Sequence, residues 1–361
     1  MSTLTTTPVS HDKLFTLDIA LDPQEMRPIL AGLANQYLGE TLDVRHVDIE
    51  VIRRRSQRCV IRYRVNAFDT QKRQRRDWGV IGKVYKSHRG ESVFEMMQEL
   101  WEKGFSRDVG DHISIPEPIE FSSSLSTLFQ EEVPGLPIKT VIKRSPKPIY
   151  LRQLARTLAK LHQCPIVPSN QLTIKEHLLH CHPRHAFLAL ACPELEPQID
   201  YIVETAERIE ADLNGIKLTP LHGDFHLGQV HLENGSAWLI DFDALGYGDP
   251  ASDVGNVLVF LKGKARKIPN ISDLIAAFLD EYFSIMEREI AGRIPLYEAL
   301  THLRRACKCL RLQEARWQGR AKRMVERGVA CLEEMGKTDW QARSQPYALA
   351  EDEEWDEVEY E

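Results

Sequence analysis

Aspartates crowd one stretch of this chain, Leu221–Asn256, where apolar residues or glycine flank each of them. That density of acid is unusual in a segment whose composition is typical of buried structure. Carboxylate and amide oxygens are hard ligands suited to Mg²⁺, which proteins usually hold with one or two carboxylates together with the phosphates of a nucleotide. The stretch therefore indicates metal and nucleotide chemistry. Its aspartates are Asp224, Asp241, Asp243, Asp249 and Asp253.

A predicted hairpin brings the oxygen-bearing side chains together. Val230–Leu232 and Ala237–Phe242 are rich in β-branched or aromatic residues, and the Asn-Gly between them is a strong hairpin signal. Gln229 and Asp241 should then lie near the same end of two paired strands, with Asp224 on the loop before the first strand. If Gln229 and Asp241 bind the metal, the carboxylate of Asp224 is left to act as a base.

The competing interpretation is that these aspartates form turns and cap helices. It is most plausible for Asp249, which precedes a proline and looks like the start of a helix over Ala251–Lys262. Both interpretations stay open for Asp243 and Asp249. For Asp224 and Asp241 we favour a role as catalytic base or metal ligand over a role in turns and caps.

Taken in order, the motifs of this stretch resemble those of the aminoglycoside phosphotransferase and choline kinase branch of the protein-kinase-like superfamily. The family pattern is His-Gly-Asp, an Asn shortly after it, a hairpin, an Asp-Phe-Gly-like strand end and Gly-Asp-Pro-x-x-Asp. At the Asn position this chain has Gln229, and its Gly-Gln-Val resembles the bacterial maltokinases. The other matching residues are His222-Gly223-Asp224, Asp241-Phe242-Asp243 and Gly248-Asp249-Pro250-Ala251-Ser252-Asp253.

The resemblance implies an α+β, bilobal protein-kinase-like fold with a small antiparallel-sheet N-lobe and a largely helical C-lobe. It also implies ATP and Mg²⁺ as cofactors, with Asp224 as the catalytic base and Gln229 and Asp241 as metal ligands. His222 is expected to brace the catalytic loop rather than to transfer protons, and Asp253 to hold that loop from the following helix. The expected parts are an N-terminal tail and helix (residues 1–40), the N-lobe (41–133), the C-lobe (134–340) and an acidic, disordered tail (341–361).

A capped helix, Gln24–Leu38, precedes the expected N-lobe, which begins with three strand-like runs. The third run ends near Lys83, which resembles the kinase lysine that pairs with the nucleotide phosphates and with a helix glutamate. On the next expected helix, Glu91–Lys103, we choose Glu95 as its partner and keep Glu91 and Glu99 as alternatives. The runs are Val44–Arg53, Arg58–Val65 and Trp78–Tyr85, with Asp69–Asp77 as a polar hairpin loop.

The resemblance also locates the nucleotide's other contacts. The turn Arg54–Arg58, which would cover the phosphates, contains no glycine, so a glycine-rich loop is absent. Ile115–Ile119 and Ser126–Glu132 look like the last strands of the sheet. The segment after them resembles the hinge between lobes, where backbone groups at Glu131 and Val133 would hold the adenine.

From Pro148 onward the pattern is helical. Leu151–His162 carries leucines on one face, which is typical of a core helix, and it resembles the Leu-Ala-x-Leu-His helix of the same family. Further helices are expected at Leu172–His180, Glu196–Leu213, Ile271–Arg293, Leu296–Arg311 and Glu314–Glu334.

Composition narrows the classes of protein. The chain has 361 residues, of which 43% are hydrophobic, enough for one large or two medium globular domains. The sequence contains no run of ~20 apolar residues, the length that a membrane-spanning helix needs, and its start lacks a secretory pattern. We therefore expect a cytoplasmic protein. The net charge of −7 comes from Glu351–Glu361, which holds eight acids and no Lys or Arg; the remainder sums to +1. Nothing argues for nucleic acid as a partner.

Cysteine and histidine usage favours no metal site. The seven cysteines show no Cys-x-x-Cys pair and fit a reducing compartment better than a disulfide framework. Histidines crowd residues 177–185, but their spacing matches no closed zinc site, and we favour solvated helix-end histidines. The residues are His177, His180, Cys181, His182 and His185.

The leading hypothesis is an ATP-dependent phosphotransferase that acts on a hydroxyl of a small molecule. The Gly-Gln-Val resemblance favours a sugar or polyol, while the wider family also takes aminoglycosides, choline and homoserine. The alternative is a catalytically silent nucleotide-binding regulator, since the glycine-rich loop is absent and the metal position is changed. A protein kinase is disfavoured because the segment between Asp241 and Pro250 is too short to seat a peptide.

The strand register around Lys83 can be tested. We expect Lys83→Ala to weaken the use of ATP and Lys86→Ala to do little, because side chains three positions apart on a strand point to opposite faces. The measurement is the KM for ATP of both variants. Equal effects would show that the register is misassigned.

Overall fold

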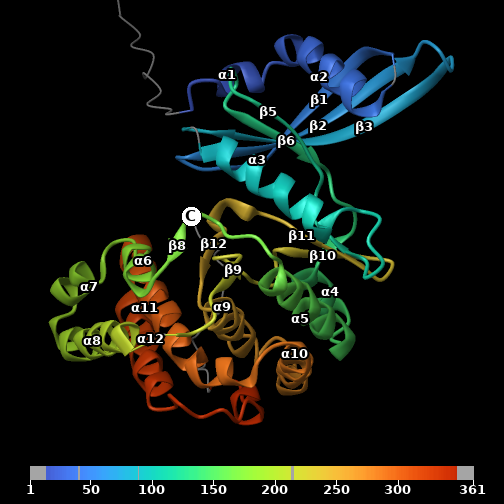
Figure 1. The fold of residues 1–361 in the computed structure, drawn as a ribbon. Helices are drawn as coiled ribbons and strands as arrows, with labels where there is room; N and C mark the ends of the chain where they lie inside the picture. The colour runs from blue at the N-terminus through green and yellow to red at the C-terminus, as the bar shows by residue number, and fades with distance from the viewer. Residues whose placement is uncertain (1–13, 40, 88, 213–214, 348–361) are drawn as a thin grey trace, which may run out of the picture. The chain divides into compact units, whose positions relative to one another are not determined.

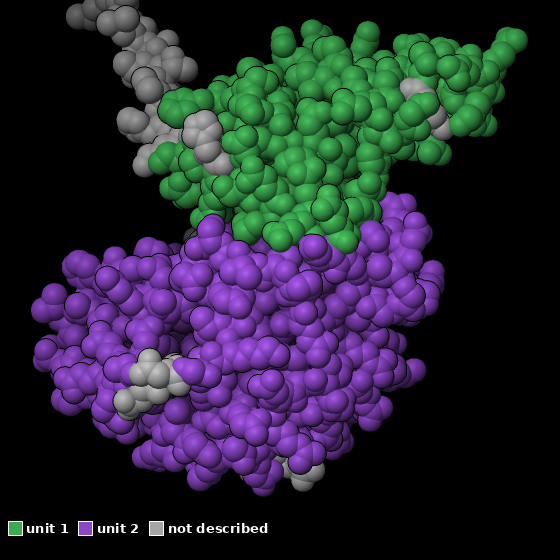
Figure 2. Space-filling model, in the orientation of Figure 1, with its two compact units in different colours: residues 1–102, 115–133, 361 green, residues 103–114, 134–360 purple. Residues whose placement is uncertain are grey.

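The computed structural model describes residues 14–39, 41–87, 89–212 and 215–347 (Figure 1). The chain divides into two compact units, which Figure 2 colours separately. The first contains residues up to 102 together with 115–133, and the second contains residues 103–114 and those from 134 onward. The acidic residues 351–361 lie outside the described residues.

The first unit is built on an antiparallel sheet whose described strands lie in the order β1-β2-β3-β6-β5. Strand β2 buries every second residue from Cys59 to Ala67, which is the period of a strand with one face against a core. The strands are β1 (Leu42–Arg54), β2 (Arg58–Asp69), β3 (Gln74–Tyr85), β5 (Pro118–Ser122) and β6 (Thr127–Glu131).

Helices cover both faces of this sheet (Figure 1). The buried face of β2 packs under α1 (Leu17–Ala20) and α2 (Pro23–Leu38), where the Tyr63 hydroxyl donates to the Ala20 carbonyl oxygen at 2.9 Å. The other face carries α3 (Arg89–Leu100). Helix α2 begins as expected, because the Asp22 carboxylate accepts from the backbone N–H of Gln24.

Lys83 lies on the face of β3 that carries α3. Val80 and Val84 belong to the core under α1 and α2, so the side chains of Ile81 and Lys83 point to the opposite face. Lys83 stands in register with Val60 on one side and Leu128 on the other, and only 5% of its surface is exposed.

The second unit is largely helical and is centred on α9 (Ala251–Lys262), every residue of which is buried. Helix α5 packs against α10, and α11 packs against both α9 and α12 (Figure 1). The other helices are α4 (Ile138–Arg144), α5 (Pro148–Gln163), α6 (Ile174–Leu179), α7 (His185–Ala191), α8 (Glu196–Asp212), α10 (Ile271–Ile285), α11 (Ile294–Leu312) and α12 (Trp317–Leu332).

Two small sheets of the second unit hold the loops between these helices. One has the order β4-β11-β10-β7 and the other β8-β12-β9. Their strands are β4 (Ile113–Ser114), β7 (Leu136–Pro137), β8 (Gln171–Leu172), β9 (Thr219–Leu221), β10 (Val230–Glu233), β11 (Ser236–Leu239) and β12 (Gly246–Gly248). Short 3-10 or π turns lie at Trp101–Phe105, Pro193–Leu195, Phe242–Ala244, Arg288–Arg293 and Gln341–Ser344.

These elements confirm the α+β class, with an antiparallel sheet in the N-terminal region and helices in the C-terminal region. Helix α9 has the bounds that the sequence predicts. No helix in the described ranges is both long and apolar enough to cross a membrane.

Several expected bounds were wrong. The polar segment Asp69–Asp77 is mostly strand, because β2 continues to Asp69 and its carboxylate closes a tight turn by accepting from the N–H groups of Gln71 and Lys72. The single helix expected over Ile271–Arg293 stops at Ile285, because the backbone of Met286 is extended. Helices α4 and α7 were not expected at all.

Candidate active site

A tight hairpin sets the position of Gln229 and Asp241. Val230 pairs with Leu239 across β10 and β11, and the turn uses Asn234 and Gly235 at φ 49° and 86°. At the open end of the hairpin the backbone N–H of Ile240 donates to the Gln229 carbonyl oxygen at 2.9 Å. The residue after Ile240 is Asp241, so the expected neighbourhood of Gln229 and Asp241 is present in the backbone.

The loop His222–Gln229 precedes this hairpin and carries Asp224. Gly223 adopts φ 78°, and a Cβ added there would lie 2.2 Å from the Ala244 carbonyl oxygen. Only glycine allows the loop to approach the segment after β11 this closely. The Asp224 side chain is 24% exposed, although its Oδ1 atom is buried.

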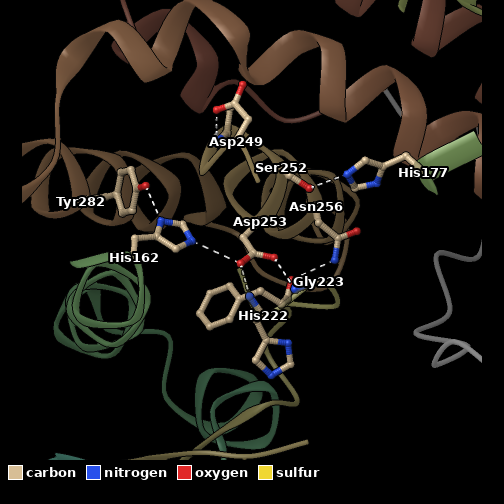
Figure 3. A network of polar contacts seen from close by, with 11 residues as sticks. His162, His177, His222, Gly223, Asp249, Ser252, Asp253, Asn256 and Tyr282 are labelled. Atoms are coloured by element: carbon tan, nitrogen blue, oxygen red, sulfur yellow. Dashed lines mark hydrogen bonds and ion pairs between the residues drawn. The ribbon is translucent and has the colours of Figure 1, made fainter. Parts of the chain in front are cut away.

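The buried carboxylate of Asp253 holds the start of this loop (Figure 3). Its two oxygens accept the backbone N–H groups of His222 and Gly223 at 2.7 and 3.0 Å. The same carboxylate lies 3.2 Å from Nε2 of His162, whose Nδ1 lies 2.8 Å from the Tyr282 hydroxyl. Asp253 therefore joins the loop that carries Asp224 to α9, α5 and α10.

Hydrogen bonding keeps Asp253 ionised despite its burial. Burial alone would raise the pKa of the carboxyl, but the hydrogen bond and charge of His162, the charge of His222 and the His222 backbone N–H outweigh it. The pKa of Asp253 is therefore lower than its ordinary value.

His222 is packed as a brace between the loop and the hairpin. Its ring is fully buried between Phe225 and Phe242, with ring centroids 5.9 and 5.8 Å away. Its Nε2–H donates to the Ile240 carbonyl oxygen at 2.9 Å. This contact ties the segment carrying Asp224 to the strand end carrying Asp241.

A second support comes from Asn256, one turn after Asp253. Its amide nitrogen donates to the Phe225 carbonyl oxygen at 3.0 Å, and its amide oxygen accepts from Arg304 at 2.7 Å and from Thr301 at 3.4 Å. The middle of the catalytic loop is therefore linked to α11.

Asp249 has a structural role. Its carboxylate accepts the N–H of Ala251 at 3.0 Å, which caps α9, and receives a bidentate pair from Arg293 at 2.7 and 3.0 Å. The capping interpretation of Asp249 fits this geometry. Arg293 is the last residue of the 3-10 turn that follows α10, so this pair joins that turn to the start of α9.

The histidine-rich segment is only partly solvated, which corrects the expectation for His177. Its Nε2 lies 3.1 Å from the Ser252 hydroxyl on α9, and its ring stacks edge-on against Tyr297. Burial, with the positive charge of Arg304, lowers the pKa of His177 to about 3. His180 and His182 are exposed, and no group of three His, Cys, Asp or Glu in the described ranges could hold a metal ion.

The donor chemistry at the hairpin fits a hard divalent cation. Gln229 is buried, and its amide group lies against the ring of His226, 3.4 Å from Nε2. Asp241 adopts the left-handed conformation at φ 68°, which is rare for a residue other than glycine. One amide oxygen and one carboxylate are a donor set that Mg²⁺ accepts when nucleotide phosphates complete its shell.

The other expected site residues belong to the first unit. The Glu131 carboxylate accepts the backbone N–H of Glu117 at 3.2 Å, and Val133 is the last residue of that unit before Pro134. Glu95 lies on the exposed face of α3, as do Glu91 and Glu99. The pairing of Glu95 with Lys83 stays a prediction.

Comparison with known proteins places these features in a family. The sequence matches the phosphotransferase enzyme family over residues 70–291. The chain belongs to that family. No curated protein matches this phosphotransferase family member.

Solved structures share its fold. A choline/ethanolamine kinase family protein from Mesorhizobium loti has a TM-score of 0.54 at 16% identity, covering 91% of this chain and 96% of that one. The amicoumacin kinase hAmiN, in complex with AMP-PNP, Ca²⁺ and Ami, has a TM-score of 0.56 at 15% identity, covering 87% and 95%. A thermostable mutant of aminoglycoside phosphotransferase APH(4)-Ia has a TM-score of 0.54 at 15% identity, covering 83% and 98%. The phosphotransferase family member thus has a protein-kinase-like fold.

Sequence reasoning missed His162, Tyr282, Arg293 and Arg304. Each lies far along the chain from the motif that it supports. Only His162 carried a signal, as the last residue of the Leu-Ala-x-Leu-His helix.

Replacing the central carboxylate tests this network. Asp253→Asn removes the charge and places an amide NH₂ against backbone N–H donors, so we expect a loss of about 2 kcal/mol or more in the free energy of unfolding at neutral pH. The pKa of Asp253 is lower in the folded than in the unfolded protein. Its ionised carboxylate therefore adds to the free energy of unfolding above the unfolded pKa of about 3.9, and this contribution is lost as the pH falls through the folded pKa.

The difference in unfolding free energy between wild type and Asp253→Asn should therefore shrink in acid. Denaturant titrations at several pH values measure it. Val257→Ala, an apolar change at a buried position of the same helix, serves as a control without such pH dependence. A pH-independent difference for Asp253→Asn would contradict the assignment.

Proposed function

We propose that the protein is an ATP-dependent small-molecule kinase that transfers the γ-phosphate to a hydroxyl group. The observation that carries the proposal is the placement of Asp224 on a loop fixed by Asp253 and His222, beside the Gln229 and Asp241 end of the hairpin. Membership in the phosphotransferase enzyme family supports it. The acceptor we propose is a sugar, polyol, aminoglycoside or amino alcohol.

Asp224 is the proposed general base. Phosphoryl transfer needs little covalent chemistry from the protein, and its main requirements are an in-line acceptor, compensation of phosphate charge and a carboxylate to take the acceptor's proton. The Asp224 carboxylate is partly exposed, while the backbone that carries it is fixed through buried groups on both sides. His222 holds this loop and takes no proton in the proposed reaction.

Gln229 and Asp241 are the proposed ligands of a divalent cation, Mg²⁺. When bound, such a cation would compensate charge on the nucleotide phosphates. The hAmiN structure contains AMP-PNP and Ca²⁺, which supports nucleotide and divalent-metal use in this fold.

The first unit supplies the proposed nucleotide contacts. Lys83, held on the central strand of the sheet, is proposed to compensate phosphate charge. Backbone groups at Glu131 and Val133 are proposed to hold the adenine, and Glu95 to pair with Lys83. These assignments rest on the order of the sequence motifs along the chain, which matches that of the family.

A screen for ADP release tests the proposed reaction. Purified protein with ATP and Mg²⁺ should release ADP faster when one of a panel of sugars, polyols, aminoglycosides or amino alcohols is added. Nucleotide binding without turnover on any member of the panel would instead support the silent regulator.

The role of Asp224 gives a sharper test. Asp224→Asn should lower kcat by ~10²- to 10⁴-fold while ATP binding stays close to wild type, because the amide keeps the shape but cannot accept a proton. Single-turnover assays and nucleotide titrations separate the two effects. Near wild-type kcat in the variant would remove Asp224 from the reaction.

The metal assignment predicts a graded series at residue 229. Gln229→Ala should raise the Mg²⁺ concentration needed for half-maximal activity and lower kcat, since Mg²⁺ demands near-octahedral oxygen geometry. Gln229→Asn should also reduce activity, because the loop with Gly228 is set for the longer side chain. An unchanged Mg²⁺ titration in Gln229→Ala, with activity abolished in Asp241→Ala, would leave Asp241 as the only protein ligand.

A further inference from the structure

Basic side chains gather on adjoining helices of the second unit. Between Arg304 and Arg327 the chain has nine Lys and Arg and two acids. Residues 262–267, at the end of α9, add four basic residues and no acid. The surface defined by these two segments is called the basic face below. Its members at helical spacing are Arg304, Lys308 and Arg311 on α11 and Arg316, Arg320, Arg323 and Arg327 at α12.

The last described residue, Tyr347, is anchored on this face. Its hydroxyl accepts from Nε2–H of His302 at 2.9 Å and donates to the Glu298 carboxylate at 3.4 Å. Lys262 and Arg327 lie over its ring, 5.5 and 5.2 Å from the centroid. The chain that follows Tyr347 therefore starts between the end of α9 and α12.

Burial keeps two histidines near this face neutral, and the positive charges of the face add to that effect. Burial lowers the pKa of His302 well below its ordinary value, and the charges of Arg327, Arg305 and Lys262 lower it further. Burial and then the charge of Arg304 do the same to the pKa of His177.

The segment after Tyr347 has the complementary charge. Glu351–Glu361 contains eight acids and no Lys or Arg. Fully extended, the fourteen residues after Tyr347 could reach up to about 46 Å. The part of α11 from residue 302 to 311 is only about 14 Å long, so the segment is long enough to reach the basic residues on it. Tethering also gives such a segment an effective concentration of the order of mM. We propose that Glu351–Glu361 binds the basic face of its own chain.

Binding there would place the acidic segment beside the catalytic loop. Arg304 contacts Asn256, which holds the Phe225 carbonyl group. Arg305 lies over the ring of Phe260, which in turn packs 5.6 Å from the ring of His226. An effect on turnover would rest on the proposed function, but the binding itself does not.

The arginine-rich strands of the first unit are a poorer partner for the acidic segment. Arg62 pairs there with Glu50 and Glu132 at 2.8 and 2.6 Å, and Arg64 lies 3.7 Å from Glu50. Acidic side chains on the same sheet thus compensate part of that positive charge.

Zero-length carbodiimide coupling of the full chain tests the contact directly. We expect cross-links from carboxylates of residues 351–361 to Lys267, Lys308 or Lys322, lost when salt is raised to about 0.5 M, where surface charges are screened. Cross-links mainly to Lys72 or Lys86 of the first unit, or none to the basic face, would overturn the proposal.

A binding assay gives the matched control. A labelled peptide of residues 348–361 should bind a chain truncated after Tyr347. It should bind the full chain about tenfold more weakly, because the chain's own acidic segment competes with the peptide. Lys308→Glu with Arg311→Glu in the truncated chain should weaken binding by about tenfold or more, whereas Arg53→Glu with Arg75→Glu should not. The proposal would be overturned if the peptide bound the truncated and full chains equally or bound neither. It would also be overturned if only Arg53→Glu with Arg75→Glu weakened the binding.

Discussion

The buried carboxylate of Asp253 is the constraint on which the loop His222–Gln229 depends. An ionised carboxylate inside a protein costs several kcal/mol unless donors surround it, and here two backbone N–H groups and an imidazole do so. Because α9 is buried along its whole length, the carboxylate cannot follow the loop if the loop moves. The N–H groups of His222 and Gly223 therefore stay where the helix places their acceptor, and the backbone of Asp224 follows.

Close packing on the other side of the loop removes the remaining freedom. Gly223 lies against the Ala244 carbonyl group, and the His222 ring fills the space between Phe225 and Phe242 while donating to Ile240. The loop is thus held between α9 and the hairpin by contacts that fail together if either partner shifts. Such a backbone suits a group that must meet an acceptor in line with a phosphate, since small misplacements are costly in phosphoryl transfer.

The local part of this arrangement could be predicted from the sequence, because Leu221–Asn256 contains its own turn signals. The hairpin follows from Asn-Gly, although its second strand ends at Leu239 and not at Phe242, and the helix α9 follows from the proline after Asp249. The distant partners could not be predicted, because nothing local to Tyr282 or Arg293 records that it meets α9. Strand β3 was expected too short because its first four residues, 74–77, are all polar and exposed and show no alternation. Strand β2 was expected to end at Val65, although its alternating burial continues to Ala67. The roles of Asp224, Gln229, Asp241 and Lys83 come from motif order and stay predictions.

Helix α11 contributes to the catalytic loop although no residue of it was expected to. The nitrogen of the Asn256 amide is committed to the Phe225 carbonyl group, and its oxygen is committed to Arg304 and Thr301. Rotating the amide would set donor against donor and acceptor against acceptor, so its orientation is fixed. The position of residue 225 then depends on where α11 holds Arg304. Arg304 also belongs to the basic face. An acidic segment bound to that face would therefore act on a side chain that two hydrogen bonds link, through Asn256, to Phe225, the residue after Asp224.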